Sequence, residues 1–171
     1  MNCSETDIKN QLAKVKANGQ YDLLHAASQA AGISMAFVLA IASRETNCTN
    51  ELGDNFHGVG IMQLDTQHAE AAQAEADGSW KTLAGQQKLI GICVEMLADN
   101  MRWAAKTYPQ FGGEFKHGWT KISASAYNGG RGNVAAGIRE YGDSDYYTTG
   151  HDYGKDVCAR ATVFEKLLKA K

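Results

Sequence analysis

The spacing of apolar residues along the chain predicts a mainly helical protein. Two short helical patterns cover Glu5 to Val15 and Tyr21 to Ala31, and an Asn18-Gly19 pair separates them. A third pattern runs from Met35 to about Thr46, directly after Ser34, which is a candidate N-cap. We expect the first two helices to serve packing.

The second half of the chain continues the helical pattern. Its longest candidate helix covers Leu83 to Thr107 and ends before Pro109, because the residue before a proline disfavours helical geometry. Shorter candidates cover Trp119 to Tyr127 and Val134 to Tyr141, on either side of a glycine-rich turn, and a last helix covers Tyr153 to Leu168.

The pattern changes at residues 52 to 64. Gly53, Gly58 and Gly60 lie close together there and predict tight turns between short strands. The sequence therefore predicts an α+β fold that is mainly α-helical, with a small β-element after the third helix.

Composition and charge narrow the class of protein. The 171 residues, 44% hydrophobic and 21% charged, fit a single domain spanning 1–171, with residues 1–20 as an N-terminal helical extension. A net charge of −2 provides no broad basic field, so we expect no nucleic-acid partner. No apolar run is long enough to cross a bilayer, so we expect no membrane association. Residues 1–7 lack the basic and apolar regions of a signal peptide, so we expect either that none exists or that it was removed.

Three carboxylates are candidates for chemistry. Glu45 ends the otherwise apolar face of the third helix, where a carboxyl retains its proton more readily than in water. Asp54 and Asp65 bracket the glycine-rich segment, and a hairpin would return both toward one cleft. One protonated carboxyl facing ionised ones is the equipment of a glycoside hydrolase. The alternatives are an exposed Glu45 paired with Arg44 or Lys81, and aspartates that serve only a turn and a cap.

Four segments, in this order along the chain, resemble the motifs of goose-type lysozymes. They are SRE at 43–45, GVGIMQLD at 58–65, SAYNGGRGNV at 125–134 and HDYGKDVCAR at 151–160. The resemblance extends from about residue 21 to 168. It implies a lysozyme-like fold with the β-element beside the catalytic cleft, and hydrolysis of the β-1,4 bond between N-acetylmuramic acid and N-acetylglucosamine in peptidoglycan.

The resemblance also implies roles for particular residues. Glu45 matches the general acid, and Asp54 and Asp65 match the carboxylates that hold or activate the attacking water, which suits an inverting mechanism. Substrate contacts are implied for a further set: Tyr127, Asn128 and Tyr153, with His68 as a weaker candidate. We expect no metal and no cofactor, peptidoglycan glycan strands as the partner, a monomer, and secretion or other delivery to a bacterial cell wall.

The four cysteines lie at least 45 residues apart, which is unlike the close pairs of a zinc site. Two disulfides or four thiols both fit that spacing. Because wall-degrading enzymes commonly work outside the reducing cytosol, we expect disulfides, with Cys3–Cys48 and Cys93–Cys158 preferred among the three possible arrangements.

Two other functions compete with hydrolysis. A lytic transglycosylase resembles this family in its glutamate and Ala-Tyr-Asn motifs, but it closes a 1,6-anhydro ring and needs no positioned water. Asp54 and Asp65 therefore favour hydrolysis. A noncatalytic peptidoglycan-binding module is the other alternative, and retention of all three carboxylates disfavours it.

Overall fold

The computed structural model describes residues 3–53, 57–114 and 118–170. It begins with α1 (Glu5–Ala17), α2 (Gln20–Ala31) and α3 (Met35–Thr46), so the three predicted helices are confirmed. The Ser4 side chain caps α1 in a capping box with Asp7. Ser34 is the N-cap residue of α3, as predicted, but its side chain makes no capping hydrogen bond.

A small antiparallel sheet follows α3, which confirms the predicted β-element. Its strands are β1 (Leu52–Gly53), β2 (Gly58–Val59) and β3 (Leu64–Asp65), in the order β1-β2-β3. Gly53 pairs with Gly58, and Gly58 pairs with Asp65 on its other side. These three residues therefore form one row across the sheet.

The chain returns to helices after the sheet: α4 (Ala69–Asp77), the short 3-10 helix η2 (Ser79–Lys81), α5 (Leu83–Thr107) and α6 (Phe111–Glu114). The bounds of α5 match the predicted long helix. The sequence analysis assigned no helix to α4, because its alanines and acidic residues give little apolar periodicity.

The remaining elements are α7 (Gly118–Gly129), α8 (Arg131–Tyr141), η3 (Thr149–His151) and α9 (Tyr153–Lys169). All three predicted helices are present. The glycine-rich turn is shorter than predicted, because Gly130 alone, at φ +78°, separates α7 from α8.

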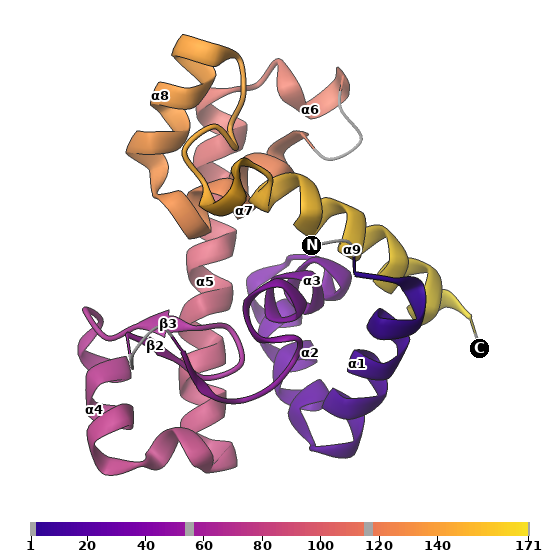
Figure 1. Cartoon of the computed structure of the whole chain (residues 1–171), viewed down its shortest axis with the longest axis vertical. Coiled ribbons are helices and arrows are strands. Elements are labelled where there is room, and N and C mark those ends of the chain that lie inside the picture. The colour runs from indigo at the N-terminus through magenta and orange to yellow at the C-terminus, as the bar shows by residue number, and fades with distance from the viewer. Residues whose placement is uncertain (1–2, 54–56, 115–117, 171) are drawn as a thin grey trace.

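Helix α3 is the centre of the core: residues 36–43 are all buried, and the helix packs against α9 and α2. Helix α5 joins two parts of the molecule. The sheet and α4 lie beside its first half, and α6, α7 and α8 gather around its last turns (Figure 1). Within the described segments, no helix combines the length and the apolar character needed to span a bilayer.

The structure contradicts the expected disulfides. All four cysteines lie among the described residues, and all are free thiols. The Gln11 amide lies between Cys3 and Cys48, donating to one sulfur and accepting from the other. The Cys93 and Cys158 side chains belong to different surroundings, since Cys93 packs behind the sheet whereas Cys158 faces a cavity between α7 and α9. Burial raises the pKa of the Cys93 thiol to about 12, so it stays protonated.

Candidate active site

Glu45 lies one residue before the end of α3 and is half-buried. Its neighbour Thr46 is buried and donates its hydroxyl to the Ile61 carbonyl, 2.9 Å away, in the segment that leads into β3. The end of the buried helix is therefore tied directly to the sheet. The carboxylate projects from a rigid element rather than from a loop.

Two tyrosines, from α7 and α9, lie near Glu45, and one of them bonds it. The Tyr153 hydroxyl donates to Glu45 Oε1 from the first residue of α9. Burial, with the Glu45 carboxylate second, raises the pKa of Tyr153 well above its usual value. Burial likewise raises the pKa of Tyr127, with Cys93 and then Glu45 adding to the effect. Both tyrosines are therefore neutral hydrogen-bond donors.

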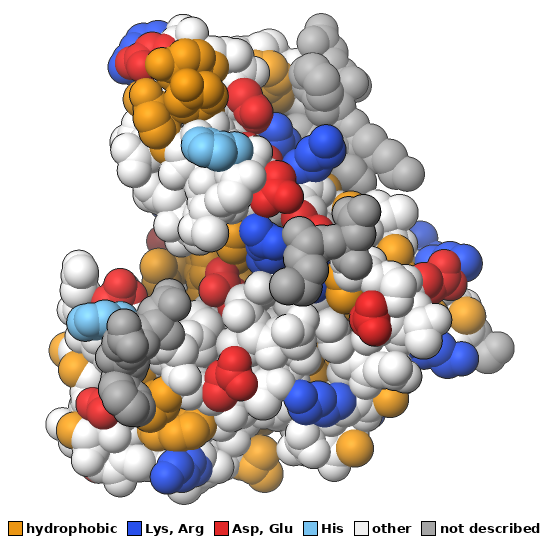
Figure 2. Space-filling model, viewed as in Figure 1, with side chains coloured by type: hydrophobic (Ala, Val, Ile, Leu, Met, Phe, Trp, Pro, Cys, Tyr) orange, Lys and Arg blue, Asp and Glu red, His pale blue; other side chains and the backbone are white. Residues whose placement is uncertain are grey.

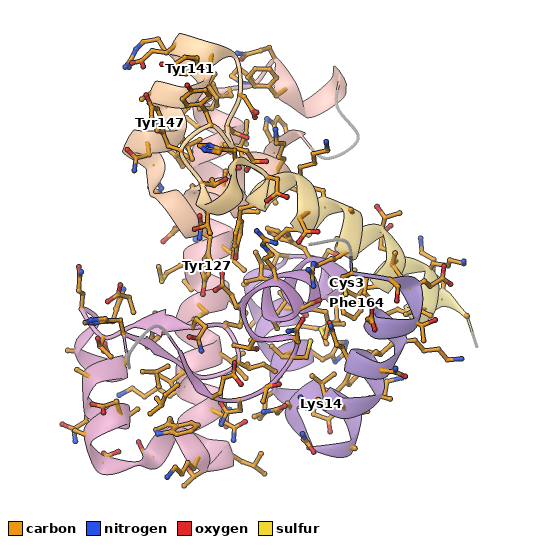
Figure 3. All side chains as sticks on the ribbon, viewed as in Figure 1. Cys3, Lys14, Tyr127, Tyr141, Tyr147 and Phe164 are labelled. Atoms are coloured by element: carbon orange, nitrogen blue, oxygen red, sulfur yellow. The ribbon has the colours of Figure 1, made fainter. Side chains whose placement is uncertain are left out.

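Tyr127 also links the helices to the sheet. Its hydroxyl donates to the Met62 carbonyl at 2.7 Å. Tyr127 lies at the level of a hollow that opens between the part containing α8 and the part containing the sheet (Figures 2 and 3). The hollow is the candidate cleft.

A chain of charged side chains fixes α9 against the end of α3. Arg160, only 3% exposed, donates to the Ser43 carbonyl at 3.0 Å and to Asp156 at 2.8 Å. Arg44 pairs with Asp152 and Asp156 at 3.2 and 3.1 Å, and its guanidinium lies 5.5 Å from the centre of the Tyr153 ring. Arg44 is thus engaged by α9, and the network holds Tyr153 next to Glu45.

A buried aspartate sets the start of α9. Asp145, 1% exposed, accepts from the backbone amides of Gly154 and Lys155 at 2.7 and 2.9 Å, and from the Ser125 hydroxyl at 2.8 Å. A carboxylate at these amides satisfies the unpaired donors of a helix N-terminus and complements its dipole. A Cβ on Gly154 would stand 2.5 Å from Ser125 Oγ, so only glycine allows α9 to approach this closely.

On the sheet side, Gln63 explains the glycines. Its amide nitrogen donates to the carbonyls of Glu51 and Gly60, at 3.1 and 2.8 Å. A Cβ at Gly53 or Gly58 would lie about 2 Å from Gln63 Oε1 (1.9 and 2.2 Å), so the side chain occupies the space that glycine leaves. The sheet is therefore braced by one polar side chain.

Asp65 is exposed at the end of the row formed with Gly58 and Gly53. Its Oδ1 accepts from the Gln67 amide at 2.7 Å, a turn within its own segment. Asp54 lies outside the described residues, directly after Gly53. Since strands are spaced about 4.8 Å apart, the Cα atoms of Gly53 and Asp65 lie about 10 Å apart.

The other two predicted site residues, His68 and Asn128, lie at the edge of the candidate site. His68 is the N-cap residue of α4, exposed on the sheet side, with Nδ1 3.9 Å from Glu70. Asn128 is exposed at the end of α7, and its Oδ1 accepts from the Thr149 amide at 2.9 Å. The structure thus brings Glu45, Tyr127 and Tyr153 together, with Asp65 and His68 on the sheet side.

The roles of Gln63, Asp145 and Arg160 were not predicted from the sequence. A signal existed for two of them: Gly53 and Gly58 imply a large neighbour, and Arg160 is a charge within the apolar stripe of α9. Asp145 had none, because it lies in a polar segment between two helices.

Comparison with known proteins identifies the family. The family model described as Lysozyme g matches residues 4–167, nearly the whole chain. The chain belongs to the lysozyme g family. The match begins at residue 4 and so includes α1, which the motifs alone did not reach.

Curated members of the lysozyme g family are about 30% identical to the chain. Lysozyme G of Dromaius novaehollandiae is 31% identical over 138 residues, which cover 78% of this chain and 60% of that protein. Lysozyme g of Gallus gallus is 30% identical over 153 residues, 84% of this chain and 63% of that protein. Lysozyme g of Takifugu rubripes is 28% identical over 160 residues, 89% and 78% respectively. The chain thus spans about 60% of the length of the first of these relatives.

Proposed function

We propose that the chain is a muramidase that hydrolyses the β-1,4 bond between N-acetylmuramic acid and N-acetylglucosamine in peptidoglycan. The observation that carries this proposal is the position of Glu45: it lies at the end of a buried helix, is hydrogen-bonded to a neutral tyrosine, and precedes Thr46, which bonds the Ile61 carbonyl in the connection between β2 and β3. Membership of the lysozyme g family and the names of its relatives support the same substrate class.

In the proposed mechanism Glu45 is the general acid. It gives its proton to the departing glycosidic oxygen while positive charge develops at the anomeric carbon. The Tyr153 hydroxyl fixes the rotamer of the carboxyl by donating to one of its oxygens. We therefore assign Tyr153, which is 2% exposed, to positioning the acid rather than to stacking on a sugar.

The water enters from the opposite face of the sugar. We assign it to Asp65, at the exposed end of the sheet, and to Asp54, which follows Gly53 in the sequence. This requires room for a water between base and anomeric carbon. Attack from that face inverts the β-configured centre. Tyr127, Asn128 and His68 remain our candidates for sugar contacts, from α7 on one side and the sheet side on the other.

We further infer one catalytic domain in which α1 takes part, because Gln11 accepts a hydrogen bond from Ser43 two residues before Glu45. A monomer delivered to a bacterial wall is the arrangement that we propose for this domain. Its partner is the glycan strand.

Two measurements on purified peptidoglycan test this function. Mass spectrometry should find reducing muramic acid ends formed by addition of water, and rapid NMR before mutarotation should find the α-anomer first. Mainly 1,6-anhydro ends, lighter by one water, would instead identify a lytic transglycosylase. If the pure, folded protein cleaves no peptidoglycan, the result would favour a noncatalytic binding module.

A further inference from the structure

Three tyrosines form an exposed cluster at the end of α8. Tyr141, Tyr146 and Tyr147 are 53%, 37% and 43% exposed, which is unusual for such large rings. Tyr141 and Tyr146 stack with centroids 3.5 Å apart and planes 5° apart, and Tyr147 meets both edge-on. We call these residues the tyrosine cluster. They account for most of the exposed large hydrophobic side chains of the described chain.

The rings are held in place by their surroundings. The Tyr147 hydroxyl donates to Glu140 at 3.3 Å, and His151 bonds the Tyr146 carbonyl. At Gly137 an added Cβ would lie 2.5 Å from the Asp143 carbonyl and 3.3 Å from Tyr146 Cβ, so the segment presses closely onto α8. Because the rings are already ordered, a ligand can bind them at little cost in side-chain entropy. The cluster therefore has the properties of a prepared surface.

The segment that carries the cluster is tied to the candidate site. Two residues after Tyr147, the Thr149 amide donates to Asn128, and the Thr149 carbonyl accepts from Arg44, next to Glu45. Figure 3 places Tyr141 and Tyr147 above Tyr127, and Figure 2 shows a hydrophobic patch over α8 on the face where the hollow opens. A glycan strand that leaves the hollow toward α8 would approach the tyrosines.

The chemistry of the cluster selects among partners. Its neighbouring charges are compensated, since Arg139 pairs with Glu140 at 2.8 Å, so the surface attracts neither a polyanion nor a polycation. Ring faces surrounded by hydroxyls suit a ligand that is apolar on its faces and polar at its rim. A pyranose ring of an uncharged N-acetylated sugar has this character. An exposed apolar patch of this kind marks an interaction site.

We propose that the tyrosine cluster binds N-acetylglucosamine units of the glycan strand outside the cleft. This proposal rests on the proposed function for the identity of the strand. It adds a second contact to the same polymer, so it raises affinity for long strands and leaves affinity for short ones to the cleft. Tyr141, the most exposed ring, contributes the outer face, and Tyr146 supports it from behind.

The experiment compares a long and a short ligand in Glu45→Gln protein, which cannot consume either. Binding to insoluble peptidoglycan is measured by depletion, and binding to N-acetylchitotriose by calorimetry. In the Tyr141→Ala/Tyr147→Ala background we expect binding to peptidoglycan to weaken about tenfold, the scale of losing one or two aromatic contacts. Affinity for the trisaccharide should stay unchanged in this double variant.

Two controls separate ring stacking from other effects. Tyr141→Phe keeps the ring face and should bind walls like the parent, whereas Leu83→Ala removes a 56% exposed side chain at the start of α5 and should change nothing. Unchanged wall binding in the double variant would overturn the proposal. So would an equal loss in Leu83→Ala, or self-association of the parent that disappears in the double variant, which would assign the cluster to a second copy of the chain.

The outcome is separable from that of the proposed function. Wild-type protein that cleaves peptidoglycan while the double variant binds walls as tightly as its parent would reject the tyrosine cluster alone. Protein that binds walls through the tyrosines but cleaves nothing would reject the muramidase and keep the cluster.

Discussion

The helical side and the sheet side of the hollow are built in opposite ways. Glu45 ends a helix whose residues 36–43 are all buried, and a hydroxyl from α9 holds its carboxyl. Asp65 is exposed at the end of a two-residue strand and bonds within its own segment. A proton donor benefits from a shielded, fixed position, whereas a group that holds water must reach solvent. The contrast suggests one task for each side, and variants on either side test that division.

The largest effect should come from the helical side. Glu45→Gln keeps the shape of the side chain but cannot donate a proton, so turnover of peptidoglycan should fall by about 10² to 10⁴. Wall binding and thermal unfolding should stay near those of the wild type. Glu165→Gln, an exposed glutamate on α9, is the matched control. Turnover near the wild-type rate in Glu45→Gln would remove this residue from the acid role.

Variants of the aspartates on the sheet side should have the second-largest effect. Asp54→Asn and Asp65→Asn should each slow hydrolysis, and the double variant should lose about 10² or more, the lower end of general base catalysis. Because both groups orient one water, their effects should be nonadditive. Steady-state rates of the singles and the double measure this directly, with exposed Asp99→Asn as control. A double variant as fast as the wild type would mean that neither aspartate handles water.

Tyr153→Phe should rank third. It removes one hydrogen bond to a carboxyl, worth about 1.5–3 kcal/mol, and should therefore lower kcat by about 10- to 150-fold. The KM for peptidoglycan should change little if Tyr153 positions the acid, and should rise if it contacts sugar. Tyr21→Phe, a tyrosine on α2 that stacks with His25, controls for the loss of a hydroxyl.

Tyr127→Phe should have the smallest effect. The bond it loses, from the hydroxyl to the Met62 carbonyl, joins two neutral groups and is worth about 0.5–1.5 kcal/mol. We expect a loss of a few-fold in turnover and a similar modest fall in stability, measured by denaturant unfolding. A larger loss than in Tyr153→Phe would show that the link between the two sides matters more than the orientation of the acid.

Local patterns could be predicted from the sequence, whereas contacts between distant side chains could not. Helices such as α3 and α5 follow from local periodicity. The glycine-rich break after α3 indicated the short strands, although Gly53 and Gly58 lie within β1 and β2 rather than in the turns. The four motifs pointed to Glu45, Tyr127 and Tyr153, which the fold brings together. Relations between distant side chains left no local pattern.

The missed features share that physical cause. Asp145 meets the start of α9 only because α7 and α9 pack closely, and Arg160 finds the Ser43 carbonyl on another helix. The expected disulfides failed for the same reason, since spacing along the chain does not show that Gln11 lies between Cys3 and Cys48. Helix α4 was missed because its small alanines bury against neighbours without a strong apolar stripe.

Two consecutive peptide units anchor the sheet side to the helices. The consecutive carbonyls of Ile61 and Met62 accept the hydroxyls of Thr46 and Tyr127, from α3 and α7. Asp65 is three residues further on, so its place depends on this anchor and hardly on the length of the connection that precedes it. Insertions and deletions between α3 and β2 are therefore tolerable over evolutionary time, since connecting segments vary more readily than the elements they join. Relatives that differ in this stretch can keep the same geometry at Asp65.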